Sequence, residues 1–270
     1  MGQSVKELKL PQKLFLQRFL AHHVMSENDA QSLWNEILDS IENKKDLGRD
    51  LNHTLTVING SLRTGFGFEV RTATLSIDFG ESFDKSKQSP STSPRKKSAF
   101  TRYHAIVNRD DDSIAKVNGN PSMVKGRGVH EMALFRLILE RLIETNMSTP
   151  EENESTTILR GAGCKASLPR MELLNLRTQL TGPHANKMDI SQTEKAVSLF
   201  ESEGWLAPAV GLPNDDNEDS RKSKKRKRRD KDRFNEANYL QIGPRTYLEL
   251  PEMLTNLGLD KELLPQFILH

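Results

Sequence analysis

The chain has 270 residues, of which 35% are hydrophobic and 28% charged, a composition that suits two domains joined by polar segments. Lysine and arginine number 39 against 37 for aspartate and glutamate, so the net charge of +2 excludes a uniformly basic nucleic-acid-binding protein. The single cysteine, Cys164, excludes intrachain disulfides and zinc sites with several cysteine ligands. Because no apolar run reaches the length of a membrane-spanning helix, no membrane contact is expected.

The first half of the chain predicts three helices followed by a strand pair. Ser26 with Asp29 three residues later predicts the start of the second helix, and apolar residues recur at helical spacing over 51–62. Residues 66–74 alternate as a strand does, and residues 103–107 are its expected partner. This order is typical of a winged helix. The first helix is predicted from one apolar face, formed by Leu14, Phe15, Leu16, Phe19 and Leu20.

The second half repeats this order. It predicts a helix over 134–142, a shorter one that begins near Pro169, and a third that is capped by Ser191 with Glu194 and ends at Gly204. Strands are expected at 205–207 and 239–242, followed by a last helix that Pro251 kinks or splits. The predicted fold class is therefore mainly α with small β-hairpins (α+β). We expect tandem winged-helix domains at 8–110 and 128–260, with disordered wing insertions at about 84–99 and 212–236.

Charge is concentrated in one segment of the second insertion. Residues 221–233 carry ten basic and two acidic side chains, a net charge of +8. Such a run is typical of a nuclear localisation signal or a nucleic-acid-binding patch, so we expect a nuclear protein with a weak, backbone-directed DNA contact. A solvated segment without a partner is the alternative. The residues that would carry these roles are Arg221, Lys222, Lys224, Lys225, Arg226, Lys227, Arg228 and Arg229.

The sequence contains no recognisable catalytic motif: a P-loop, a GxSxG elbow and an HExxH zinc motif are all lacking. The third helix of neither predicted domain is distinctly basic, which argues against reading of the DNA groove and favours protein contacts. The candidate anchors for a protein partner are Phe15, Phe19 and Trp34. The alternative is that these three are core residues, because amphipathic helices bury their apolar face first.

Three stretches resemble one protein family in the same order along nearly the whole chain. These are residues 15–27, residues 199–206 with their Glu-Gly-Trp-Leu, and residues 240–250 with their Gly-Pro-Arg-Thr-Tyr-Leu-Glu-Leu. The chain resembles the non-SMC element one subunit of the Smc five/six chromosome-maintenance complex. The resemblance implies two winged-helix domains followed by a RING-like zinc domain, a MAGE-type partner, a kleisin partner, indirect contact with the Smc five/six heterodimer, and a role in DNA repair and recombination.

The family acts as a RING-type ubiquitin ligase together with its MAGE-type partner, and this sequence departs from that pattern. The zinc ligands would follow Leu269, but the sequence ends at His270. The residues present cannot supply ligase chemistry, so no cofactor is expected in this chain, and zinc is expected only if a RING-like domain is missing from it. The expected function is a nuclear docking subunit. The alternative is a winged-helix DNA-binding or transcription-type protein, whose DNA binding would survive removal of residues 221–233.

Overall fold

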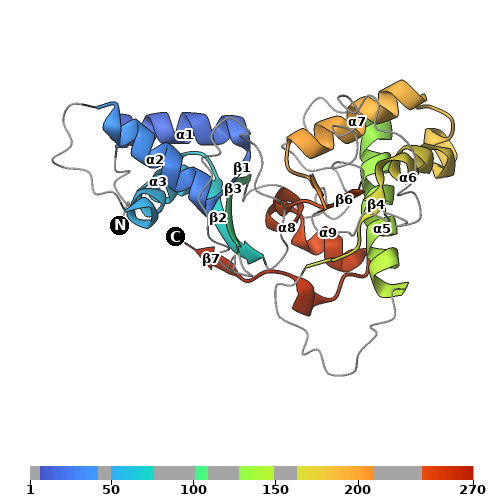
Figure 1. The fold of residues 1–270 in the computed structure, drawn as a ribbon. Coiled ribbons are helices and arrows are strands. Elements are labelled where there is room, and N and C mark those ends of the chain that lie inside the picture. Colours follow the sequence, from blue (N-terminus) through green and yellow to red (C-terminus); the bar gives the residue numbers. More distant parts are fainter. Residues whose placement is uncertain are drawn as a thin grey trace, which may run out of the picture.

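The computed structural model describes residues 7–41, 50–75, 101–108, 128–148, 163–209 and 239–269. These residues are mainly helical with small antiparallel sheets, which confirms the predicted α+β class. Figure 1 shows two groups of elements side by side: an N-terminal unit from α1 to β3 and a C-terminal unit from α5 to α9. The insertions predicted at 84–99 and 212–236 lie outside the described residues, and the domain boundaries 8–110 and 128–260 stay predictions.

The N-terminal unit has the predicted order of three helices and a strand pair. Ser26 caps the second helix as predicted, since its hydroxyl oxygen accepts the Asp29 N–H at 3.2 Å. Asp50 caps the third helix by accepting the Asn52 N–H at 2.9 Å. The elements are α1 (Leu10–His22), β1 (Val24–Ser26), α2 (Glu27–Asp39), α3 (Leu51–Gly65), β2 (Phe68–Leu75) and β3 (Thr101–Asn108).

The C-terminal unit repeats this order, and Pro251 splits its last helix into α8 and α9 as predicted. The predicted cap of the third helix was wrong by two residues. Asp189 and Gln192 form the capping box in place of Ser191 and Glu194. The elements are α5 (Val129–Ser148), β4 (Leu168–Pro169), α6 (Arg170–Asn175), the 3-10 turns η2 (Leu176–Gln179) and η3 (Gly182–His184), α7 (Ile190–Ser202), β5 (Leu206–Pro208), β6 (Tyr239–Ile242), α8 (Pro244–Glu249), α9 (Pro251–Asn256) and the turn η5 (Lys261–Leu263).

Each unit also contains a short strand that periodicity did not predict. Strand β1 follows the first helix of its unit and pairs antiparallel with β3, and β4 likewise pairs with β6. The hairpins pair as predicted, β2 with β3 and β5 with β6. Strands of two or three residues are too short to show an alternating pattern, so only their partners reveal them.

Two aromatic clusters lie at the centres of the two cores. In the N-terminal unit, the Phe15 ring packs edge-on against Trp34 with centroids 5.9 Å apart, and Phe19 lies 5.8 Å from Phe15. In the C-terminal unit, Phe135 packs against Phe200 and Trp205 at 4.9 and 5.8 Å. Every one of these six side chains is at most 2% exposed, so each unit has a core of its own.

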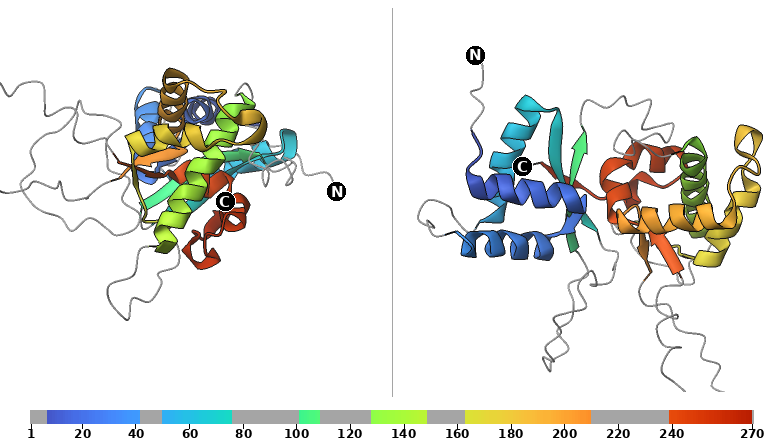
Figure 2. Two further views of the ribbon diagram at one scale, coloured as in Figure 1. Left: turned by 90° about the vertical axis from the view of Figure 1, so that its right-hand side faces the viewer. Right: turned by 90° about the horizontal axis from the view of Figure 1, so that it is seen from above.

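The end of the described chain returns to the N-terminal unit. Strand β7 (Phe267–Leu269) pairs antiparallel with β2, which gives the first sheet the order β1-β3-β2-β7. The right-hand view of Figure 2 shows this red segment crossing from the C-terminal unit to the strands of the N-terminal unit. Sequence analysis predicted no strand here. The pairing fastens the end of the described chain to the N-terminal unit.

Candidate protein-interaction surface

The three predicted anchors lie inside the core of the N-terminal unit. Phe15, Phe19 and Trp34 are each 0% exposed, which agrees with the alternative reading of them as core residues. Side chains without exposed surface cannot contact a partner directly. Any docking on this part of the protein must therefore use the residues on the outer side of α1 and α2.

Helix α1 exposes leucines on its outer side, in addition to the apolar residues that it buries on its inner side. Leu10 is 64% exposed, Leu14 36% and Leu20 45%, whereas Phe15 and Phe19 point into the core. Residues four apart share a helix face, so Leu10 and Leu14 lie together while Phe15 and Phe19 lie together on the other side. The prediction of one face that included Leu14 and Leu20 was therefore wrong. We call Leu10 and Leu14 the leucine face.

The charged side chains beside the leucine face form exposed, weak ion pairs. Lys13 pairs with Glu7 at 3.0 Å, and Arg18 on α1 pairs with Glu36 on α2 at 3.1 Å. All four side chains are more than half exposed, so each pair contributes little to stability. Helix α1 itself contains no acidic residue. The outer side of α1 thus carries exposed leucines among polar and charged side chains, a mixture that also occurs at protein interfaces.

Backbone contacts join residues 199–206 to residues 240–250, and both to β1. We call this place the junction. Gly204 has a φ of +78°, and a Cβ atom there would lie 2.5 Å from Cγ1 of Val24 in the N-terminal unit. A Cβ on Gly243 would collide with the backbone of Gly204 and Trp205. The Gly243 N–H donates to the Trp205 carbonyl at 2.8 Å, and the Arg245 N–H donates to the Gly204 carbonyl at 3.1 Å. Both glycines are required because two chain segments meet here without room for a side chain.

Arg245 is the buried cation of this junction and is 0% exposed. Its guanidinium lies 4.1 Å from the centre of the Trp205 ring, and its Nε donates to the Glu249 carboxylate at 2.6 Å. A longer ion pair of 3.5 Å reaches Glu203. The stacking on tryptophan and the two carboxylates compensate for the removal of this charge from water. In the sequence, Trp205, Arg245 and Glu249 belong only to a family-like pattern. No local signal there indicates that Arg245 is buried.

Tyr247 and Cys164 form a second buried contact under α8. The Tyr247 hydroxyl accepts the Cys164 backbone N–H at 2.8 Å. Burial raises the pKa of the Cys164 thiol to about 11 and raises the pKa of Tyr247 well above its usual value. The nearby Cys164 sulfur contributes to the shift at Tyr247. A thiol that keeps its proton is a poor nucleophile, which supports the interpretation of Cys164 as a structural residue.

Helix α8 also contacts the sheet of the N-terminal unit. Leu248 is 0% exposed and packs in one cluster with Ala73, Ala105 and Val107 from β2 and β3. The Arg71 guanidinium donates to the Leu248 carbonyl at 2.8 Å and lies 5.1 Å from the centre of the Phe267 ring on β7. Together with the β2–β7 pairing, these contacts hold the leucine face in a defined orientation relative to the C-terminal unit.

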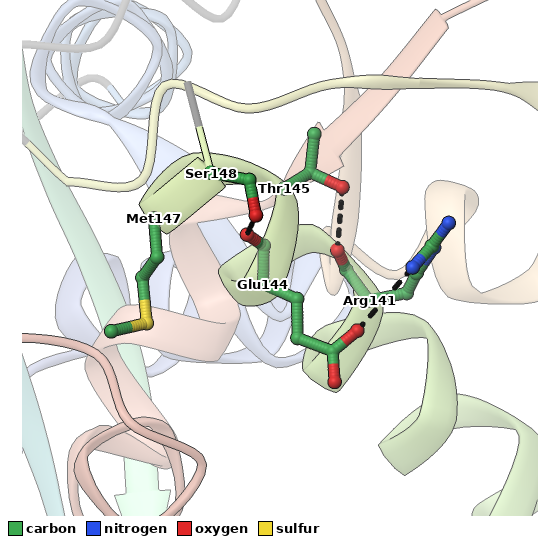
Figure 3. A pocket seen from close by; sticks show the side chains of 5 residues that line it. All are labelled: Arg141, Glu144, Thr145, Met147 and Ser148. Atoms are coloured by element: carbon green, nitrogen blue, oxygen red, sulfur yellow. Dashed lines mark hydrogen bonds and ion pairs between the residues drawn. The ribbon is translucent and has the colours of Figure 1, made fainter. Parts of the chain in front are cut away.

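The structure describes a shallow surface depression and no cluster of three metal-ligating side chains within the described residues. An open depression at the end of α5 is lined by Arg141, Glu144, Thr145, Met147 and Ser148, all from one helix (Figure 3). Its charged residues, Arg141 and Glu144, pair with each other at 3.4 Å. No group of three or more metal-ligating side chains occurs in the part of the chain that the structure describes. Within the same residues, no helix has the length and apolarity to cross a bilayer.

The nucleic-acid prediction gains no support from α7, the third helix of the C-terminal unit. Its exposed side carries one cation, Lys195, beside the acidic Glu194. Arg170 of α6 is paired with Glu201 at 2.7 Å and also donates to the Ser198 hydroxyl at 2.6 Å. The basic residues predicted to contact DNA or an import receptor, 221–229, lie outside the described residues.

Comparisons with known proteins place this architecture in a family. The family model described as "Nse1 non-SMC component of SMC5-6 complex" matches residues 12–209, well over half of the chain. A search of curated proteins gave no match. Among solved structures, a chain of an "Nse1-Nse3-Nse4 complex" is similar with a TM-score of 0.51 and 17% identity, over 91% of this chain and 73% of that chain. At this identity the likeness concerns the fold, and the family match carries the assignment: the chain belongs to the Nse1 family of non-SMC components of the SMC5-6 complex.

Proposed function

We propose that this chain is a nuclear docking subunit of the SMC5-6 complex that acts in DNA repair and binds a MAGE-type partner through the leucine face of α1. Family membership supports the place in the complex. The similar chain of known structure comes from an Nse1-Nse3-Nse4 complex, which supports a MAGE-type and a kleisin partner for this chain as well. Contact with the SMC heterodimer would then be indirect.

The order of elements supports the assignment of both units as winged helices. In each unit a short strand after the first helix, β1 or β4, joins the hairpin that follows the third helix. This is the arrangement in which three helices pack on one side of a small sheet and the hairpin forms the wing. Winged helices bind proteins as well as DNA, so the assignment alone does not decide the partner.

The exposed leucines are the observation that carries the docking proposal. Leu10 and Leu14 present apolar surface on a helix whose other side, with Phe15 and Phe19, is already buried in the core beside Trp34 of α2. Fully burying a leucine side chain contributes about 1.5–3 kcal/mol. Because Leu10 is 64% exposed and Leu14 36%, burying their remaining surface together contributes about as much as one whole leucine, about 1.5–3 kcal/mol of the roughly 8 kcal/mol that a micromolar affinity requires.

The test compares charged substitutions on two helices. Leu10→Glu with Leu14→Glu should weaken binding of the MAGE-type partner at least tenfold in calorimetry, because two carboxylates would have to leave water and enter an apolar contact. Leu199→Glu on α7 is the matched control, since Leu199 is 43% exposed, and it should bind as the unchanged protein does. Unchanged binding by the Leu10→Glu/Leu14→Glu protein would refute docking through α1, and loss of binding by the control would move the docking face to α7.

The nuclear role of the basic run is a separate proposal that rests on its charge of +8 over residues 221–233. Deletion of this run should abolish nuclear accumulation of a fluorescent fusion and remove weak, salt-sensitive DNA binding, while partner binding persists. Sequence-dependent DNA binding that survives the deletion would instead favour the DNA-binding alternative. Nuclear accumulation without the run would refute its role as an import signal.

A further inference from the structure

Two histidines meet in the C-terminal unit at a place that the docking function does not use. His130 lies in the first turn of α5, and His184 is the last residue of the turn η3. Their Nδ1 atoms are 3.0 Å apart, and their rings are tilted by 77° with centroids 5.2 Å apart. Both side chains are half-buried. The contact joins elements that are 54 positions apart in the sequence.

The contact joins two imidazole rings directly. Among the described residues, the other imidazole is the side-chain partner of each ring, and neither ring takes part in an ion pair. Two Nδ1 atoms at this distance cannot both carry a hydrogen. Either one proton lies between them, or both lone pairs bind one cation.

We propose that His130 and His184 form a binding site for one divalent transition-metal ion of the class that imidazole prefers, such as Zn²⁺, Ni²⁺ or Cu²⁺. Two metal–nitrogen bonds of about 2.1 Å that meet at about 90–110° span about 3.0–3.4 Å, so the Nδ1 separation of 3.0 Å suits one ion. The rings now lie as in a hydrogen bond, with centroids 5.2 Å apart, and would turn so that both lone pairs point at the ion. Imidazole nitrogen is a preferred ligand of these ions. Water completes the coordination, since the described residues place no third metal-ligating side chain at the site.

The position of the site indicates what the ion would do. Turn η3 precedes α7 in the chain, and the ion would fasten it to the start of α5. A ligand that binds the folded protein alone raises its stability, so added metal should raise the melting temperature in a concentration-dependent way. Binding should weaken in acid, because a protonated imidazole has no lone pair to donate. This site lies in a different part of the molecule from the leucine face, so neither proposal depends on the other.

The test titrates Ni²⁺ into the full chain, purified without a histidine tag and treated with a chelator. We expect one equivalent to bind in calorimetry, with the affinity at least tenfold lower in His130→Gln and in His184→Gln. His53→Gln, which changes an exposed histidine on α3, is the matched control and should bind Ni²⁺ as before. Undiminished binding in both variants of the pair, or no binding by the unchanged chain, would overturn the proposal.

A second measurement on the unchanged protein guards against a variant that fails to fold. Paramagnetic Ni²⁺ should broaden the NMR signals of the His130 and His184 rings at substoichiometric amounts, before those of other histidines. First broadening at the adjacent His22 and His23 would show that the ion binds at the end of α1, and this too would overturn the proposal.

Discussion

Gly204 offers the sharpest test of the junction between the two units. Its φ of +78° belongs to the left-handed region, and a Cβ atom would lie 2.5 Å from Cγ1 of Val24 on β1. Gly204→Ala therefore introduces backbone strain and pushes β1 away from the C-terminal unit. Gly60→Ala is the matched control, because Gly60 is exposed on α3 and a Cβ atom there meets nothing within 4 Å.

The expected magnitudes follow from these two environments. Left-handed backbone costs about 1–2 kcal/mol for a residue with a side chain. Overpacking of a close contact adds about 1–3 kcal/mol. We expect Gly204→Ala to lower the free energy of unfolding by about 2–5 kcal/mol, a large part of the total of about 5–15 kcal/mol that is usual for a folded protein. Gly60→Ala should raise it by about 0.5–1 kcal/mol, because alanine is favoured over glycine within a helix.

The assay is urea denaturation followed by tryptophan fluorescence, since Trp34 and Trp205 report on the two cores. Val24→Ala removes Cγ1, so the double variant Gly204→Ala/Val24→Ala should recover the packing part of the loss but keep the backbone strain. This recovery appears as a coupling energy of about 1–3 kcal/mol in a double-mutant cycle. Strictly additive effects would show that Gly204 does not touch β1. A Gly204→Ala protein that is as stable as the unchanged chain, or that gains stability as Gly60→Ala should, would refute the whole account.

Three further outcomes follow from other buried groups. Arg245→Met leaves the buried Glu249 without its cation and should lower the free energy of unfolding by about 3–5 kcal/mol. The double variant Arg245→Met/Glu249→Leu should recover most of this loss in urea denaturation. A double variant without recovery would contradict the pairing of these two residues. Burial raises the pKa of Cys164 from 9.0 to about 11, so the folded protein keeps a proton that the unfolded chain loses, and stability should fall between pH 9 and 11. Cys164→Ala should reduce that slope in pH-dependent melting, whereas an unchanged slope would exclude this thiol as a cause. Phe15→Ala should lower the free energy of unfolding by about 3–5 kcal/mol, whereas Leu10→Ala should change it by no more than about 0.5 kcal/mol, as measured by thermal melting. Equal losses would contradict the assignment of the buried and exposed sides of α1.

Helix α1 shows where hydrophobic periodicity reaches its limit. Its apolar residues located the helix correctly, yet they did not distinguish Leu14, which is 36% exposed, from Phe15, which is 0% exposed. An apolar stripe indicates which side of a helix is buried only when the opposite side is polar. Helix α1 also carries leucines on its exposed side, so its pattern is ambiguous. The contact of Phe15 with Trp34 on α2 decides which side is buried. The periodicity therefore located the helix but not the exposed leucines on which the docking proposal rests.

Local signals also place element ends only approximately. Both Asp189 with Gln192 and Ser191 with Glu194 satisfy the capping pattern at the start of α7. The backbone extends at Asp189, and its carboxylate accepts the Gln192 N–H at 2.7 Å, so the helix begins two residues earlier than predicted. Choosing between overlapping caps requires the path of the preceding chain, which comes from η3 in the folded protein.

The sequence by itself determined the order of the helices, the two hairpins, the split at Pro251 and the resemblance to the Nse1 family, because periodicity, caps and prolines act within a few residues. Only the tertiary structure decided the junction. The hydrogen bond from Arg71 to the Leu248 carbonyl joins positions 177 residues apart, and β7 pairs with β2 over a similar distance. Arg245 looks like any surface arginine until Trp205 and Glu249 enclose it. Such contacts depend on where whole elements pack, and no local pattern carries that information.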